Sequence, residues 1–197
     1  MHYPEHLQKL ILLFKKFPGV GTRSAERFAF HLLDWPEEKL LEIGKVFSQT
    51  KEKLTHCTEC GVLIEEKCPF CTHPTRLTSL LCLVASPKDV FSIEQTHAFN
   101  GLYHVLGGVL SPLQGLSPPA DSIKKLKNRI KTLEVKEIIL ALDSTLEGDT
   151  TALYLKKELE SLHITASRLA LGLPMGSSLD FIDGGTLARA LAGRQAY

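Results

Sequence analysis

The sequence lacks a long uninterrupted hydrophobic run, and it has almost no net charge. No stretch approaches the roughly eighteen apolar residues that a membrane helix needs. The first ten residues, MHYPEHLQKL, carry charges and a proline where a signal peptide has an apolar core. We therefore expect a cytoplasmic protein with no membrane partner. The 23 basic and 22 acidic side chains leave a formal net charge of +1, so binding to nucleic acid has to come from a local basic patch.

Aromatic residues and cysteines are also few. The one tryptophan, Trp35, has no aromatic neighbour in the sequence, which makes it a poor platform for stacking bases. Five cysteines are an odd number, and four of them lie in two CxxC pairs. In a reducing cytoplasm this arrangement favours a metal site over disulfides. The fifth, Cys82, lies in an apolar strand and is predicted to be a buried small residue.

What the sequence does contain is a globular composition, with 44% apolar residues, and a helical N-terminal region up to about residue 54. Two apolar stripes at helical spacing predict two helices, and a third is predicted at roughly 36–54. The stripes consist of Leu7, Leu10, Ile11 and Phe14, and of Ala25, Phe28, Ala29 and Leu32.

Between the two stripes lies the glycine turn FPGVGT, residues 17–22. Gly19 and Gly21 permit dihedrals that other residues resist, and they leave bare N–H groups at the start of the next helix, where phosphate oxygens bind. Thr22 is the predicted N-cap, and Arg23 and Arg27 lie one turn apart, off the apolar stripe. The segment FPGVGTRSAERFAFHLL resembles the helix-hairpin-helix motif, which binds DNA backbones without sequence preference. An ordinary helical hairpin that needs glycine for its turn is the alternative.

The four paired cysteines follow a CxxC–x7–CxxC pattern, CTECGVLIEEKCPFC. Residues 56–76 are too short to hold a core of their own, so they need a staple. Four thiolates are the standard ligand set of structural zinc, and no open coordination position is implied. A zinc site is therefore predicted, with redox dithiols or an iron–sulfur cluster as the alternatives. The proposed ligands are Cys57, Cys60, Cys68 and Cys71.

From Leu77 onwards strands alternate with helices, which predicts a parallel α/β sheet. Strands are expected at 77–85, 103–110, 137–142 and 164–171, helices at 88–96, 122–133 and 149–162, and a Pro/Gly-rich loop at 111–121. The C-terminal part is rich in loops, with a short helix at about 186–192. The chain as a whole is predicted to be an α+β chain of several parts.

Two features of this half have ordinary explanations that compete with functional ones. The helix SIKKLKNRIKTL is expected to present a solvated basic face, and a secondary DNA contact is the alternative. Its cations are Lys124, Lys125, Lys127, Arg129 and Lys131. His104 is expected to be a core or interface histidine and not a ligand.

The strand order, with an acidic cluster after EIILAL, resembles the Toprim domain of primases, topoisomerases and related nucleases. That family places a glutamate after its first strand and acidic residues after a later one, and together they hold magnesium for phosphodiester chemistry. Here Ala85 stands at the glutamate position. Asp143, Glu147 and Asp149 form a DxxxExD cluster in place of DxD. Half of the metal site is thus missing, and a metal-dependent Toprim nuclease or primase-like enzyme is kept only as an alternative.

Taken together, the parts resemble the RecR family of bacterial recombination mediators over essentially the whole chain. Four segments carry the resemblance in order: FPGVGTRSAERFAFHLL, GLYHVLGGVLSPLQG, EGDTTALYL and LARALAGRQ. It implies a helix-hairpin-helix domain at 1–55, a zinc motif at 56–76, a Toprim domain at 77–172 and a C-terminal segment at 173–197. In that last segment SSLDFID has been likened to a Walker B strand, but the chain has no GxxxxGK[ST] loop and ATP hydrolysis is not inferred.

The resemblance also implies a role. Such proteins are non-catalytic DNA-binding factors that form dimers and ring-like tetramers, and with RecO, and often RecF, they help load RecA onto coated single-stranded gaps. Gly19, Gly21, Thr22, Arg23 and Arg27 would then bind DNA. The acidic cluster at 143–149 would meet a protein partner such as RecO. A purely structural zinc protein without nucleic acid is a further hypothesis, motivated by the near-zero net charge.

Overall fold

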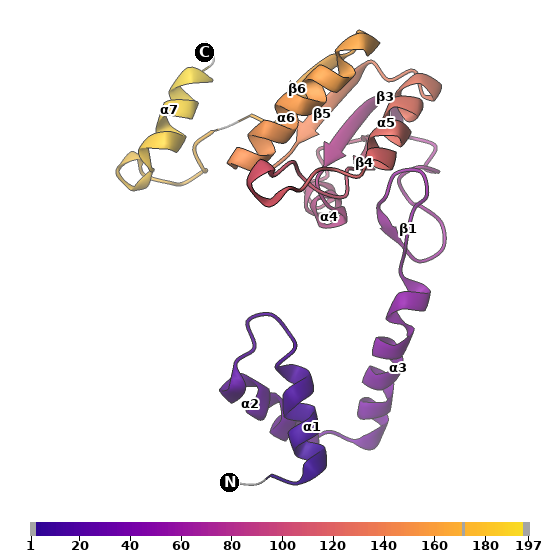
Figure 1. Ribbon diagram of the computed structural model, residues 1–197, viewed down its shortest axis with the longest axis vertical. Helices are drawn as coiled ribbons and strands as arrows, with labels where there is room; N and C mark the ends of the chain where they lie inside the picture. The colour runs from indigo at the N-terminus through magenta and orange to yellow at the C-terminus, as the bar shows by residue number, and fades with distance from the viewer. Residues whose placement is uncertain (1–2, 171, 195–197) are drawn as a thin grey trace. The chain divides into compact units, whose positions relative to one another are not determined.

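The computed structural model describes residues 3–170 and 172–194, and the chain divides into two compact units, residues 1–53 and 54–197. The N-terminal unit consists of α1 (Glu5–Phe14), α2 (Thr22–Leu33) and α3 (Glu37–Lys53), as Figure 1 shows. The second unit contains the four cysteines, a parallel sheet and the C-terminal helix.

In the N-terminal unit α1 and α2 form a hairpin around a small core. Leu7 and Ile11 of α1 pack against Ala25 and Ala29 of α2, so both predicted helices are confirmed, although Phe28 of the second stripe is 38% exposed. The small alanines let the two helices approach closely. None of the seventeen residues of α3, all of which are described, is buried, so α3 contributes nothing to this core.

The second unit is built on a four-stranded parallel sheet in the order β4-β3-β5-β6, which confirms the predicted α/β fold. Its elements are β3 (Leu77–Val84), α4 (Pro87–Glu94), β4 (Gly101–Val105), α5 (Ala120–Thr132), β5 (Glu137–Ala141), α6 (Leu146–Leu159) and β6 (Thr165–Arg168). In the central pair Val84 of β3 lies beside Ala141 of β5. The two strands therefore end at the same level, which brings the segments that follow them together.

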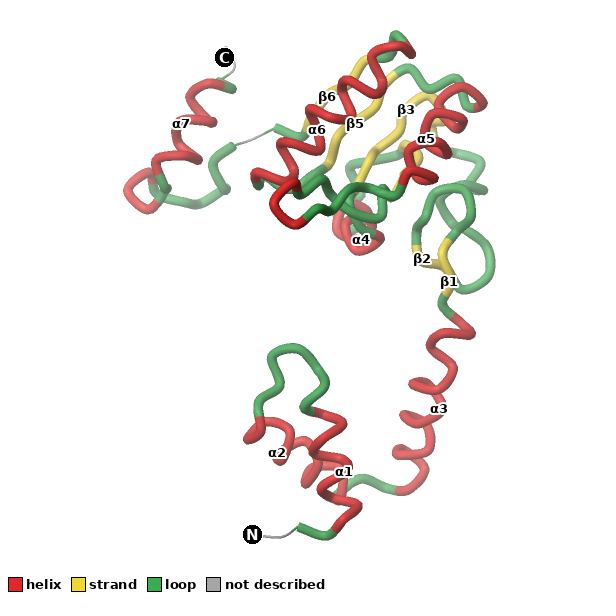
Figure 2. The backbone as a smooth tube through the Cα atoms, in the orientation of Figure 1, coloured by secondary structure: helices red, strands yellow, loops and turns green. Residues whose placement is uncertain are grey.

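Alternate residues of the strands enter two separate cores, because successive side chains of a strand point to opposite faces. Leu81, Leu83 and Ile138 belong to the core shared with α5 and α6. Cys82 and Val84 belong to the core on the other face, which contains Val90 of α4 and the four-cysteine motif, residues 57–71. Figure 2 shows the helices around the sheet. The second face is thus closed by the cysteine motif and not by a helix alone.

The four-cysteine motif joins the sheet directly at its edge. Its two short strands, β1 (Thr55–His56) and β2 (Leu63–Ile64), pair antiparallel. The N–H of Val105 on the edge strand β4 donates to the carbonyl of Cys60 at 2.8 Å. Gly61 has φ +77°, and a Cβ there would lie 3.1 Å from the Val105 Cβ. Only glycine allows this left-handed turn so close to the strand.

The structure differs from expectation after β4. The segment 103–110 was expected to be strand-like, but β4 ends at Val105, because Gly107 takes φ +81°. The loop that follows is still ordered by specific bonds. Ser111 and Leu116 pair through two backbone hydrogen bonds of 2.9 and 3.0 Å. The N–H of Leu110 donates to the buried Thr151 hydroxyl of α6 at 2.7 Å.

The C-terminal segment was expected to contain a Walker-B-like strand, and this expectation is wrong. Leu179–Phe181 form a short 3-10 helix, followed by α7 (Gly184–Ala192), whose N-cap Asp183 accepts a hydrogen bond from the Thr186 N–H. Leu171, the end of the last expected strand, lies outside the described residues. Within the described chain, none of the helices combines the length and the apolar character needed to cross a membrane.

Candidate functional site

The glycine turn presents an uncapped helix start at the surface. Gly19 has φ +78°, a conformation that favours glycine. Gly21 is the N-cap of α2, with φ −78° and ψ 174°. The prediction that Thr22 caps this helix is therefore wrong, because Thr22 is already its first helical residue. Within the described chain, no side chain hydrogen-bonds to this cap. The first N–H groups of α2 thus face outwards, with the positive end of the helix dipole behind them.

Arg23 and Arg27 lie on one face of α2, because residues four apart are neighbours on a helix. Both side chains are exposed. The Arg27 guanidinium lies 5.7 Å from the centre of the Phe28 ring. The turn and both arginines are therefore exposed on the N-terminal unit, with Phe17 and Phe28 also exposed beside them.

The four predicted metal ligands come together in the second unit. The sulfur atoms of Cys57, Cys60, Cys68 and Cys71 all lie within 4.8 Å of one another, and those of Cys60 and Cys68 are 3.5 Å apart. A tetrahedral ion with metal–sulfur bonds of about 2.3 Å needs sulfurs about 3.8 Å apart. The four residues therefore fit a bound metal ion.

Without a bound ion, the surroundings of Cys60 and Cys68 favour their protonated form. Hydrogen bonding with Cys71, followed by burial, raises the pKa of Cys60, and burial raises the pKa of Cys68. Four ionised thiols this close repel one another, and a divalent cation removes that cost by binding thiolates. Cys82, by contrast, is not part of this group and is 2% exposed. Burial raises its pKa to about 12, which confirms the prediction of a small buried residue.

The basic helix α5 does not present a single solvated face. Arg129 is only 8% exposed, and the amine of Lys127 lies 2.6 Å from the Glu158 carboxylate of α6. The expectation that all five cations are solvated is thus wrong for Arg129, whereas Lys127 is paired but its side chain is still 36% exposed. Lys124, Lys125 and Lys131 are exposed. His104 is 2% exposed, which confirms that it is a core histidine.

A cavity of about 890 Å³ lies at the carboxyl ends of the parallel strands, where ligand sites of such sheets are found. We call it the carboxyl-end cavity. Ala85, directly after β3, and Asp143, two residues after β5, both line it. Residues 56–59 around the first cysteine of the motif also line it. The position at which Toprim enzymes place a glutamate therefore does face this cavity, and here it carries a methyl group.

The acidic cluster is not a single set of free carboxylates. Asp143 is exposed at the cavity, and Glu147 lies in the first turn of α6. Asp149 is held by two arginines, with Arg168 of β6 at 2.6 Å and Arg189 of α7 at 2.9 Å. The pKa of Asp149 is lowered, mainly by the hydrogen bond from Arg168. Across residues 3–170 and 172–194, the four cysteines are the one group of at least three Cys, His, Asp or Glu side chains close enough to hold a metal ion.

The acidic segment, residues 143–149, is tightly folded. The N-cap of α6 is Thr145, whose hydroxyl accepts from the Gly148 N–H at 3.1 Å. A Cβ at Gly148 would lie 2.0 Å from the Asp143 carbonyl oxygen. The chain therefore doubles back on itself here, and only a hydrogen at position 148 leaves room for that.

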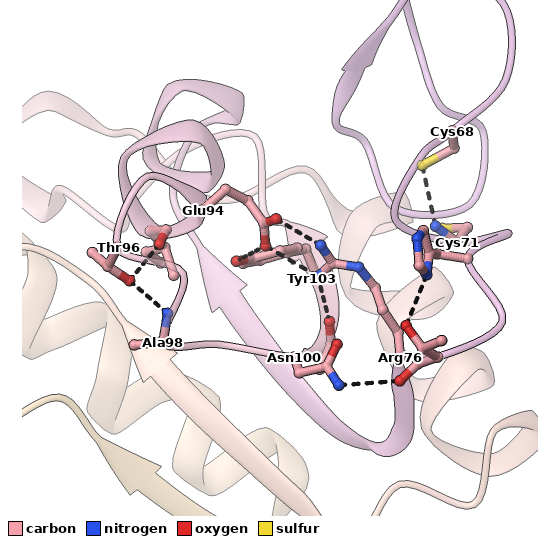
Figure 3. A network of polar contacts seen from close by, with 12 residues as sticks. Cys68, Cys71, Arg76, Glu94, Thr96, Ala98, Asn100 and Tyr103 are labelled. Atoms are coloured by element: carbon pink, nitrogen blue, oxygen red, sulfur yellow. Dashed lines mark hydrogen bonds and ion pairs between the residues drawn. The ribbon is translucent and has the colours of Figure 1, made fainter.

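Sequence reasoning missed the ion pair that joins the cysteine motif to the sheet (Figure 3). Arg76 donates to the Glu94 carboxylate at 3.0 and 2.6 Å and to the Gly101 carbonyl at 2.9 Å. Its guanidinium lies 4.9 Å from the centre of the Phe70 ring. The Tyr103 hydroxyl donates to the same carboxylate at 2.5 Å. These partners lie up to 27 residues from Arg76 in the sequence, too far for a local pattern to indicate the contact.

Comparisons with known proteins agree with this architecture. Three family models match the chain: "RecR, helix-hairpin-helix" over residues 7–50, "Toprim domain" over residues 79–170, and "RecR, C-terminal" over residues 172–195. A hairpin unit, a four-cysteine motif and a parallel sheet of this kind define a Toprim protein of several parts.

Relatives specify the family. A protein of Protochlamydia amoebophila (strain UWE25) named "Recombination protein RecR" is 60% identical over 198 residues, covering 100% of both chains. Proteins of the same name from Chlamydia abortus (strain DSM 27085 / S26/3) and from Staphylococcus saprophyticus are 52% and 43% identical, over 100% and 98% of each chain. The chain belongs to the RecR family of recombination proteins.

Proposed function

We propose that this protein is a non-catalytic recombination mediator subunit in the cytoplasm of a bacterium. It binds DNA without sequence preference and, with RecO and RecF, helps load RecA onto gapped single-stranded DNA. The observation that carries the proposal is the alanine at the carboxyl-end cavity, in a chain that retains the helix-hairpin-helix surface. A Toprim fold that keeps its DNA-binding part but lacks the carboxylate for metal chemistry is better suited to a scaffold than to a nuclease.

The DNA surface is the glycine turn with Arg23 and Arg27. The space around Gly21 is empty, since a Cβ built there meets nothing within 4 Å, and its φ of −78° suits any residue. The fold of this unit therefore does not require glycine at position 21. Close approach of a phosphate to the backbone does, because a side chain would stand between the N–H groups and the ligand.

A salt titration of DNA binding tests this surface. Arg23→Glu with Arg27→Glu should weaken binding to gapped DNA at least tenfold at low salt and flatten the dependence of affinity on salt. Lys45→Glu on α3, which is exposed in the same unit, is the control for charge and should change affinity by less than threefold. Equal effects of both changes would leave only a general electrostatic attraction.

The proposed metal is zinc, held by Cys57, Cys60, Cys68 and Cys71, because four thiolates form a closed structural zinc site, and three of these residues are buried. When bound, the ion ties the motif together and supplies no open coordination position. Elemental analysis of the purified protein should give one zinc per chain. A Cys68→Ser variant with full zinc content and unchanged folding would contradict the assignment.

Self-association is proposed through exposed apolar side chains of the N-terminal unit. Leu41, Val46 and Phe47 of α3 are 67%, 61% and 64% exposed. On a monomer such side chains face water, whereas in a dimer or a ring-like tetramer they can be covered. Phe47→Glu should lower the mass measured by sedimentation, while Gln49→Glu on the same helix should not. A wild-type protein that is monomeric at micromolar concentration would refute the proposed self-association.

The acidic segment is the proposed contact for a partner such as RecO. Asp143 is its exposed carboxylate at the cavity, Glu147 is partly buried, and Asp149 is already compensated by two arginines. Asp143→Asn should therefore reduce RecO-dependent loading of RecA onto coated gapped DNA without changing DNA binding. Magnesium- or manganese-dependent cleavage of nicked, gapped or supercoiled DNA that Asp143→Asn abolishes would instead establish the enzyme alternative.

A further inference from the structure

Arg129 of α5 is a buried cation that reaches one of the four cysteines. Its Nη2 donates to the Cys71 sulfur at 3.7 Å, and its Nη1 donates to the Tyr103 carbonyl at 2.8 Å. The same Nη1 lies 3.3 Å from Nδ1 of His104. The residue is only 8% exposed. One guanidinium thus touches the cysteine motif and two residues of the edge strand β4, Tyr103 and His104.

Burial of this arginine requires a compensating negative charge, because an isolated buried cation is strongly destabilising. The described contacts of Arg129 are a carbonyl, a neutral ring and a thiol sulfur, and none of these is a carboxylate. Four thiolates around a divalent ion carry a net charge of minus two. A metal-bound cysteine cluster supplies the negative charge that the described hydrogen-bond partners of Arg129 lack.

The ring of His104 transmits the position of this arginine to the start of α5. An arginine only donates, so the Nδ1 facing it accepts and the proton lies on Nε2. Nε2 then donates to the Ser122 carbonyl at 3.2 Å. Burial is the main reason that the pKa of His104 is lowered to about 4, and the positive charge of Arg129 is the second. The ring is therefore neutral at pH 7. The contacts run in sequence from Cys71 through Arg129 and His104 to Ser122.

We propose that Arg129 is an outer-sphere residue of the four-cysteine metal site, positioned by α5, which makes metal binding and the α5–β4 contact one cooperative unit. Its hydrogen bond to the Cys71 sulfur withdraws electron density from that ligand and compensates part of the excess negative charge. Loss of the metal then leaves the guanidinium buried without a counter-charge and loosens β4. This inference rests on the metal binding proposed above.

Cobalt substitution tests the contact directly, because the sulfur-to-cobalt charge-transfer band reports on the electron density of the thiolates. Arg129→Met should shift this band to longer wavelength and weaken metal affinity about 10–100-fold in competition with a chelator. Arg129→Lys keeps the charge but not the fork of donors, so its band position and metal affinity should lie between those of the wild-type protein and Arg129→Met. The control is Lys127→Met on the same helix, since the Lys127 amine pairs with Glu158 and has no described bond to a cysteine sulfur. It should leave the band in place.

The outcomes separate the inference from the proposal beneath it. If the wild-type protein takes up neither zinc nor cobalt, the proposed metal site itself is refuted. Metal uptake with the same band and the same affinity in the Arg129→Met and Lys127→Met variants overturns only the role of Arg129. If Arg129→Met does not fold, nuclear magnetic resonance of the unchanged protein decides. The Arg129 guanidinium protons should be protected from exchange with metal bound and should lose protection on chelation, and equal protection in both states refutes the coupling.

Discussion

Replacement of Arg76 by methionine is the sharpest test of how the cysteine motif is held on the sheet. The Arg76 side chain is 11% exposed and that of Glu94 is 26% exposed. The replacement keeps most of the apolar length but removes the donors to Glu94. A carboxylate that is mostly buried then keeps only the Tyr103 hydroxyl among its described hydrogen-bond donors.

The expected cost follows from the degree of burial. Removing one partner of a fully buried ion pair costs about 3–5 kcal/mol, whereas an exposed pair contributes about 0–1 kcal/mol. The partial exposure of Glu94 reduces the first figure, and the lost contact with the Phe70 ring adds about 0.5–1 kcal/mol. We expect a loss of about 3 kcal/mol. Glu94→Gln in the same chain should recover roughly half of it, because no unpaired charge then stays behind.

Hydrogen exchange of the β4 amides, residues 101–105, is the suitable assay. Fluorescence is not, because the one tryptophan, Trp35, lies in the N-terminal unit. A loss of about 3 kcal/mol speeds exchange of amides that open globally by roughly 100-fold, at about 1.4 kcal/mol per factor of ten.

Lys127→Met provides the matched control, since its pair with Glu158 has the same 2.6 Å separation but side chains 36% and 33% exposed. It should change exchange less than about fivefold. If Arg76→Met has an effect no larger than this control, the pair behaves as a surface salt bridge and the reasoning from burial fails.

Three further outcomes are expected. Gly148→Ala should destabilise the second unit by about 3 kcal/mol, because its new methyl group overlaps the backbone. Gly44→Ala, where the new methyl group meets nothing within 4 Å, should instead stabilise α3 by about 0.5–1 kcal/mol. Equal effects of the two changes in thermal melts would contradict this. Thr151→Val should lower the free energy of unfolding by about 1–2 kcal/mol and speed hydrogen exchange of the Leu110 amide about tenfold, because that N–H loses its acceptor. Unchanged exchange would show that this hydrogen bond does not hold the loop. The pKa of His104 is lowered from 6.5 to about 4 in the folded protein, so the unfolded state binds the proton first as the pH falls. The free energy of unfolding should therefore drop by about 3 kcal/mol between pH 6.5 and pH 4. The same pH dependence in His104→Gln would refute this.

The sequence determined the local and repetitive parts of the fold. The stripes that begin with Leu7 and Ala25 predicted the hairpin correctly, because a helix brings residues three and four apart onto one face. Buried strands alternating with helices predicted the parallel sheet, because parallel neighbours need a crossover between them. The two CxxC pairs predicted the cysteine cluster, since each short turn directs two sulfurs to one point.

Tertiary structure alone decided what lies between these parts. Arg129 looks like one more solvated cation in a basic helix, yet it is buried against Cys71, because its direction depends on which face of α5 meets the sheet. Asp149 looks like a free carboxylate, yet arginines from β6 and α7 hold it. Such contacts join residues far apart in the chain, and no periodic pattern encodes them. Local spacing therefore specifies elements and ligand sets, while burial and charge pairing appear only once the elements are assembled.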